Sequence, residues 1–116
     1  MGRVDVCIEA PFHQMTAEDV MKIVLEEISL ADPSERNLHG LELQRLPLDP
    51  VLEEYVSFDG SLKFQYWTVL DEREDRSGYT IYYDPDAEIF GLGVRSDKGV
   101  VDVGAHGSFM NTFRGM

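Results

Sequence analysis

The sequence predicts an α+β fold, in which an antiparallel β-meander sheet carries an N-terminal helix after the first strand and a short C-terminal helix. Three observations predict it: helical spacing of apolar residues within 16–31, short alternating segments separated by turn residues within 51–106, and a helical segment after 108. The 116 residues suffice for one hydrophobic core, so we expect a single domain spanning 1–116.

The first third of the chain predicts a strand followed by a helix. Apolar residues alternate in "RVDVCIEA" (3–10), which is typical of a strand, and a proline ends it. Thr16 is a typical N-cap with Asp19 at the third helical position, and the next proline places the end of this helix near Ala31. Beyond it, "LELQRL" (41–46) could form a strand.

The second half predicts the meander and its closing helix. The segment 51–58 is ambiguous between a helix and a strand, and "DG" at 59–60 predicts a hairpin turn. Four strands then follow at "SLKFQYWTVL", "YTIYY", "IFGLGVR" and "VVDVGA". Ser108 is the expected N-cap of the last helix, with Phe109 and Phe113 four residues apart as an apolar pair.

The acids of "DPDAE" (84–88) alternate like the first half of a calcium loop. Counted from Asp84, however, Ile89 stands where that loop needs glycine and Arg95 where it needs a bidentate Glu. A turn is the better interpretation, and we expect no metal there. The lone Cys7 has no partner for a zinc or redox motif and is expected to be structural, and no phosphate-binding loop or other cofactor motif is found.

Period-two alternation assigns two faces to the meander. One face is expected to be the core, and it carries Leu62, Phe64, Tyr66, Leu70, Tyr79, Ile81, Tyr83, Phe90, Leu92, Val94, Val101, Val103 and Ala105. The opposite face combines Trp67 and Tyr82 with Gly91, Gly93 and Gly104, which predicts a shallow groove beside two aromatic anchors. In the alternative, the glycines only form bulges and the chain termini cover Trp67.

Successive turns of a meander alternate between the two ends of its sheet. The turns at 59–60 and 84–88 should therefore share one end, which contains acids without a Lys or Arg. Together with the aromatic pair they form the predicted partner-binding site, which consists of Asp59, Trp67, Tyr82, Asp84, Asp86 and Glu88.

The net charge of −12 and the pI of about 4.4 indicate the class of partner. Such a surface repels nucleic acid and anionic membranes, and it favours a basic protein. The sequence starts without an apolar leader and has no run long enough to cross a bilayer, so we expect a cytoplasmic protein.

In size, acidity and lack of catalytic motifs, the chain resembles the immunity proteins of bacterial toxin systems and other small acidic inhibitors. The resemblance implies a bacterial, non-catalytic protein that neutralises a basic protein such as a toxin, as a monomer or a homodimer. Two alternatives stay open. A small acidic secretion chaperone would dimerise through an apolar strand or helix, and an enzyme of unrecognised class would need a deep apolar pocket with converging polar groups.

Overall fold

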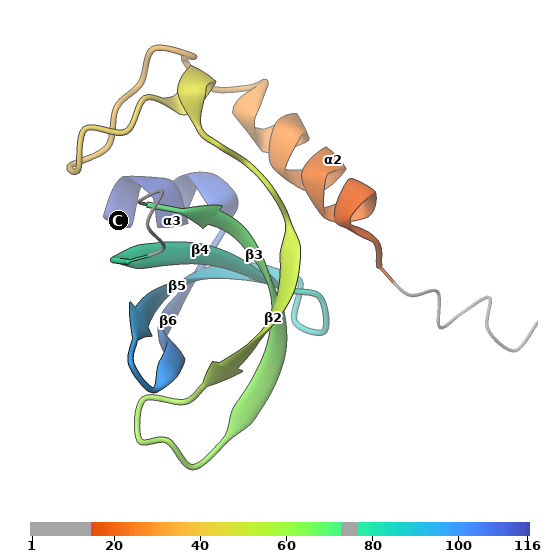
Figure 1. The fold of residues 1–116 in the computed structure, drawn as a ribbon. Coiled ribbons are helices and arrows are strands. Elements are labelled where there is room, and N and C mark those ends of the chain that lie inside the picture. Colours follow the sequence, from red (N-terminus) through yellow and green to blue (C-terminus); the bar gives the residue numbers. More distant parts are fainter. Residues whose placement is uncertain (1–14, 73–76) are drawn as a thin grey trace, which may run out of the picture.

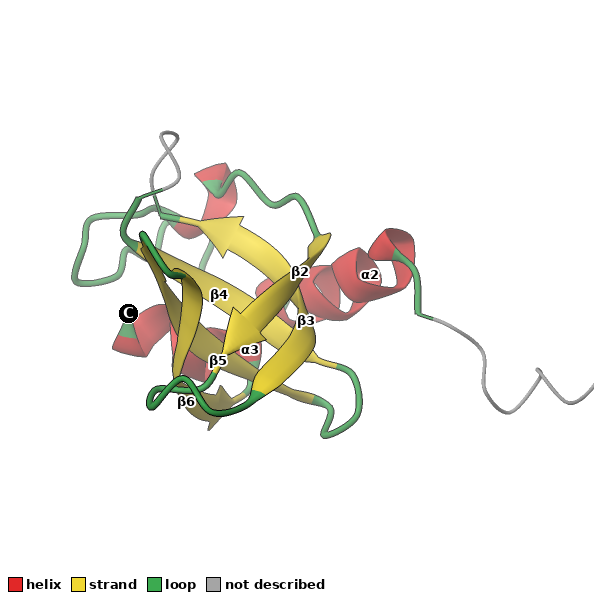
Figure 2. Cartoon of the chain, turned by 60° about the horizontal axis from the view of Figure 1, so that its bottom comes forward, coloured by secondary structure: helices red, strands yellow, loops and turns green. Residues whose placement is uncertain are grey.

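A computed structural model describes residues 15–72 and 77–116 and shows a five-stranded β-barrel with two α-helices (Figure 1). The helices are α2 (Ala17–Ile28) and α3 (Phe109–Gly115), and a short 3₁₀ helix, η2 (Leu43–Arg45), precedes the barrel. The strands are β2 (Val51–Val56), β3 (Lys63–Asp71), β4 (Tyr79–Asp84), β5 (Ile89–Ser96) and β6 (Gly99–Gly107). Both helices lie behind the strands in Figure 2, on one side of the barrel.

Helix α2 begins where the sequence predicts. Thr16 and Asp19 form a capping box, in which each side chain accepts a hydrogen bond from the backbone N–H of the other. The helix ends at Ile28 rather than near Ala31, because the N–H groups of Leu30 and Ala31 bond three residues back and tighten the chain into turns. The predicted cap of α3 is also present, as Ser108 accepts a hydrogen bond from the N–H of Asn111.

The sheet is mostly antiparallel and the fold mixes helices and strands, as predicted, but the expected open meander is wrong. Strand β2 pairs antiparallel with β3 and parallel with β6, through the partners Tyr55↔Val100 and Val56↔Val101, and this pairing closes the barrel. Closure removes the exposed sheet edges that an open meander would leave.

Two further expectations concern the chain before the barrel. The strand predicted at 3–10 lies outside the described residues, so the first described element is a helix, and the order of elements differs from the prediction. The strand considered at 41–46 is wrong, because Leu43 and Gln44 donate their N–H groups to Glu35 and Pro33 in a compact loop containing η2. The ambiguous segment at 51–58 is strand β2 up to Val56.

Buried side chains form two clusters, one on each face of the barrel wall. The outer cluster packs the strands against the helices and contains Val20, Val24, Leu43, Val69, Leu70, Ile81, Tyr83, Phe90, Leu92, Phe109, Met110, Phe113 and Met116. The inner cluster fills the barrel and contains Tyr55, Tyr66, Tyr82 and Val100, with Phe64 beside it. The predicted core face is therefore split, since Phe64 and Tyr66 point inward while Ile81 and Tyr83 point to the helices.

The barrel interior is a narrow space that glycines make wide enough for tyrosine rings. A Cβ atom on Gly91 would lie 2.4 Å from the ring of Tyr82, and one on Gly93 would lie 2.6 Å from the ring of Tyr55. The Tyr55 hydroxyl lies 2.7 Å from the Thr68 hydroxyl and 2.9 Å from that of Thr80, so its polar end is satisfied in the interior.

One end of the interior is closed by ion pairs. The Arg95 guanidinium donates to both carboxylate oxygens of Glu53, at 2.7 and 3.1 Å, and also to Asp71. These side chains are largely buried, and a bidentate geometry of this kind is the strong form of a charged hydrogen bond. The opposite end of the barrel carries the candidate site.

Candidate functional site

The candidate site is built on a stack of aromatic rings at the end of the barrel remote from Arg95. The rings of Phe64 and Tyr66 stack with centroids 5.4 Å apart, and those of Tyr66 and Tyr82 stack at 4.4 Å with planes only 10° apart. Phe64 and Tyr66 are two residues apart on β3, and Tyr82 lies on the neighbouring strand β4, so all three side chains point to the inner face. Phe64, at the end of the stack, is partly buried.

Three carboxylates surround this end of the stack, and we call Asp84, Asp86 and Asp102 the acidic mouth. The partners Trp67↔Tyr83 and Thr68↔Tyr82 fix the register of β3 and β4, and continuing it places Asp84 opposite Tyr66. The Tyr82 hydroxyl donates to the Asp102 carboxylate at 2.8 Å.

Backbone groups hold two of these carboxylates in place. Asp84 accepts a hydrogen bond from the N–H of Asp86 at 3.0 Å, which is the turn predicted for "DPDAE". Asp102 accepts one from the N–H of Gly104, also at 3.0 Å. Within the described ranges, no group of His, Cys, Asp or Glu side chains is arranged to hold a metal ion.

The negative charge of the acidic mouth affects the pKa values of its two tyrosines, Tyr66 and Tyr82. Burial, followed by the charges of Asp84, Asp102 and Asp86, raises the pKa of Tyr66 to about 12. Burial and the hydrogen bond to Asp102 also raise the pKa of Tyr82 well above its ordinary value. Both phenols therefore stay protonated in a strongly negative environment at neutral pH.

The carboxylates of the acidic mouth, like those of Asp49, Asp59 and Asp97, form no ion pair with a Lys or Arg among the described residues. Ion pairs do engage Glu35, Glu42, Glu53, Glu54 and Asp71 with arginines or a lysine. None of the described residues forms an ion pair with a carboxylate of the acidic mouth. Its negative charge is left for the solvent or for a partner.

The predicted pairing of Trp67 and Tyr82 on one open face is wrong. Tyr82 is only 2% exposed inside the barrel, whereas Trp67 faces outward beside Tyr83 and packs partly against the outer cluster. The register explains the error: Tyr82 lies opposite Thr68, one residue beyond Trp67, and consecutive strand residues point to opposite faces.

The predicted acids are divided among three environments. Asp84 and Asp86 lie in the acidic mouth, and the side chain of Glu88 is close enough to Tyr83 on the outer face for its charge to act on that phenol. Asp59 lies in the β2–β3 hairpin, at the bottom of Figure 1, while the β4–β5 turn projects at the right. The Asp59 carboxylate accepts hydrogen bonds from Ser57 and Ser61, which hold its pKa at about 2. Because β2, β3, β4 and β5 pair antiparallel in order, the two turns lie at the same end of the barrel, as predicted, although they project in different directions in Figure 1.

Sequence reasoning missed Tyr66 and Asp102. Alternation placed Tyr66 on the core face, and Asp102 appeared as one polar residue among several on the opposite face. The only available signal was the pair Gly91 and Gly93, whose missing side chains make room for interior rings and so indicate a crowded face.

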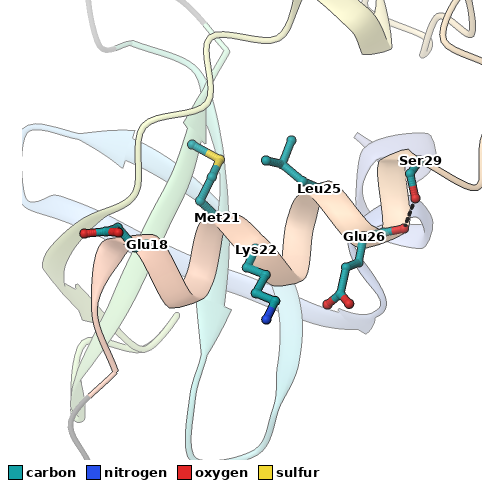
Figure 3. A pocket seen from close by; sticks show the side chains of 6 residues that line it. All are labelled: Glu18, Met21, Lys22, Leu25, Glu26 and Ser29. Carbon is teal, nitrogen blue, oxygen red and sulfur yellow. Dashed lines mark hydrogen bonds between the residues drawn. The ribbon is translucent and has the colours of Figure 1, made fainter.

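A second surface feature lies on α2. Met21 and Leu25 project to one side of the helix in Figure 3, and Lys22 and Glu26 project to the other. The groove that these side chains line together with Glu18 and Ser29 is shallow and open, and Leu25 is 50% exposed. This feature is a partly apolar helix face rather than an enclosed pocket.

No family model, curated protein or solved structure matches this chain, so the candidate site depends on its own geometry. A helix with the length and apolar character needed to cross a bilayer is not found among residues 15–72 and 77–116.

Proposed function

We propose that this protein is a non-catalytic binding protein that engages a basic protein partner through the acidic mouth, in the manner of an immunity protein or inhibitor. One observation carries the proposal: three carboxylates gather around one end of the barrel and no described Lys or Arg neutralises them. The interior behind them is filled by stacked rings, which leaves a rigid charged surface.

The physical basis is electrostatic steering. Fixed charges of one sign on a rigid support attract an oppositely charged protein before contact, and they raise its association rate constant from about 10⁵–10⁶ to about 10⁸–10⁹ M⁻¹s⁻¹ at low salt. Inhibitors of toxic basic proteins benefit from rapid capture. The net charge of −12 adds a long-range field of the same sign.

The test begins with a partner captured from the source cells, whose association is then followed by stopped-flow fluorescence. The double variant Asp84→Asn with Asp86→Asn should lower the association rate constant and flatten its dependence on salt between about 0.01 and 1 M, where the Debye length falls from about 30 to 3 Å. The matched control removes two exposed charges elsewhere, as Asp49→Asn with Asp97→Asn. Equal effects of the two double variants would show that the acidity serves general solubility and would overturn the proposal.

A secretion chaperone is the second candidate, and the α2 face favours it. Such a chaperone would dimerise or hold an apolar segment through Met21 and Leu25 (Figure 3). Sedimentation equilibrium distinguishes the chaperone from the inhibitor. A dimer that the substitution Leu25→Glu dissociates would favour the chaperone, and a monomer at all concentrations would favour the inhibitor.

A further inference from the structure

The hairpin between β2 and β3 carries two large apolar side chains in solvent. Phe58 is 84% exposed and Leu62 is 58% exposed, and neither belongs to a buried cluster. Single exposed apolar residues are common on protein surfaces, so exposure alone does not indicate a function. Two further observations, the hydrogen bonds of this turn and its place on the barrel, make the hairpin an interaction surface.

Hydrogen bonds fix the conformation of the turn that presents Phe58. The N–H of Gly60 donates to the Ser57 carbonyl at 2.9 Å. The Asp59 carboxylate accepts three bonds, one from the Ser57 hydroxyl and two from the hydroxyl and N–H of Ser61, at 2.7 to 2.9 Å. A side chain on a turn that is already ordered loses less entropy on binding than one on a loop that must first fold, so this turn favours affinity.

The hairpin lies at the end of the barrel that carries the acidic mouth, because β2 to β5 pair antiparallel in order. Asp59 follows Phe58 directly, and its pKa of about 2 keeps it ionised at neutral pH. Lys63, at the start of β3, pairs with Glu54. This end of the barrel therefore combines an exposed apolar tip with carboxylates that form no ion pair with any described Lys or Arg.

We propose that Phe58, with Leu62 beside it on the hairpin, is the apolar anchor of the complex and inserts into an apolar pocket of the basic partner that is flanked by Lys or Arg side chains. This inference rests on the proposed function. It names the residue that retains the partner after the acidic mouth has attracted it.

Charge distinguishes the basic partner from other occupants of this surface. Asp59 and the net charge of −12 repel an anionic membrane, and they repel a second copy of this chain in the same way. A pocket flanked by Lys or Arg is instead attracted to the ionised tip and to the acidic mouth at the same end of the barrel. An apolar anchor in a desolvated centre with polar groups at the rim is also the usual architecture of a protein interface.

Dissociation of the partner captured from the source cells tests the anchor. Phe58→Ser should raise the dissociation rate constant about 30-fold, the factor that corresponds to the lower limit of a hot spot, ~2 kcal/mol. The association rate constant should hardly change, since the substitution removes no charge. Leu38→Ser is the matched control, because Leu38 is 86% exposed and lies in the loop before η2, and it should alter neither rate constant. Both side chains are exposed, so thermal melts should show native Tm values for both variants.

A photo-cross-linker at the same position identifies the surface that receives Phe58. The full chain with Phe58→p-benzoylphenylalanine is irradiated together with the captured partner, and mass spectrometry locates the attached residues. We expect attachment to apolar residues of the partner that have Lys or Arg side chains around them. Attachment to a second copy of this chain, or to a wholly polar or acidic segment of the partner, would overturn the proposal.

The outcomes separate this inference from the function on which it rests. If the partner leaves the Phe58→Ser variant as slowly as it leaves the Leu38→Ser variant, the anchor is refuted. The proposed function survives that result whenever the partner still associates more slowly with the Asp84→Asn, Asp86→Asn variant. If association does not depend on these acids either, or if the source cells yield no basic protein that binds, both proposals are refuted.

Discussion

Replacing Gly91 by alanine distinguishes a closed barrel from an open sheet, because the substitution changes the free energy of unfolding in opposite directions in the two cases. On an open sheet face, alanine in a strand should be more stable than glycine by about 0.5–1 kcal/mol. In the closed barrel, the added Cβ would lie 2.4 Å from both Cζ and the hydroxyl oxygen of Tyr82 and 2.7 Å from the carbonyl oxygen of Gly104. A methyl group cannot occupy that space unless the ring or the backbone moves.

The expected magnitude follows from these distances. Overpacking a filled core by one methyl costs about 1–3 kcal/mol, and the upper half of that range applies because one of the three close atoms belongs to the backbone. We therefore expect Gly91→Ala to lower the free energy of unfolding by about 2 kcal/mol, even after the gain in strand propensity is subtracted. For a domain of this size that corresponds to a fall of about 8 °C or more in Tm.

Urea unfolding followed by the fluorescence of Trp67, with circular dichroism as a second probe, measures this change. Gly115→Ala is the control, because its Cβ would only contact the His106 ring at 3.6 Å, and the substitution should be neutral or slightly stabilising in a helix. A Gly91→Ala variant as stable as the native protein would refute the closed interior and restore the open groove.

Three other perturbations give definite expectations. Arg95→Met should cost about 3–5 kcal/mol by removing the guanidinium that pairs with the largely buried carboxylates of Glu53 and Asp71, and the deficit in urea unfolding should shrink at acid pH as these carboxylates become protonated. Burial raises the pKa values of Tyr55 and Tyr66 to about 12. The stability that these protonated phenols contribute is therefore complete below about pH 10 and is lost as the pH rises to about 12. Thermal melts at alkaline pH, with tyrosinate absorbance as the titration signal, measure this loss. Glu27→Gln should cost about 1 kcal/mol in thermal melts, because the carboxylate accepts from the first two N–H groups of α3, at 3.1 and 3.2 Å.

Short-range sequence signals were sufficient to predict individual helix caps and turns. The Thr16 cap, the turn at 59–60, the Asp84 turn and the Ser108 cap each depend on contacts within a few residues, and all are present in the structure. Such contacts involve short-range backbone geometry that propensity describes well.

The closure of the sheet depends on contacts that no local pattern reports. Much of both faces of strands β3 to β5 is buried, because the helices cover one face and the opposite barrel wall covers the other. The alternation of apolar and polar residues along a strand cannot show which face points into the barrel when both faces are buried. The irregularity between Thr68 and Leu70 also shifts the register, so counting by two from either strand end gives a different face for Leu70. The acidic mouth depends on that register, and only Asp84 and Asp86 could be found from sequence.

The seam between β2 and β6 determines how this barrel should assemble. Only two residue pairs close it, Tyr55↔Val100 and Val56↔Val101, whereas β2 is joined to β3 by six. Every other strand pairing joins neighbours along the chain, and each can form as a hairpin on a microsecond scale. The seam must instead bring together segments separated by more than forty residues, which carries a larger loop-closure entropy for less pairing. We expect closure to be the last step of folding and the first to reverse. In native-state hydrogen exchange, amides that bond across this seam should then exchange before those in the middle of the β4–β5 hairpin.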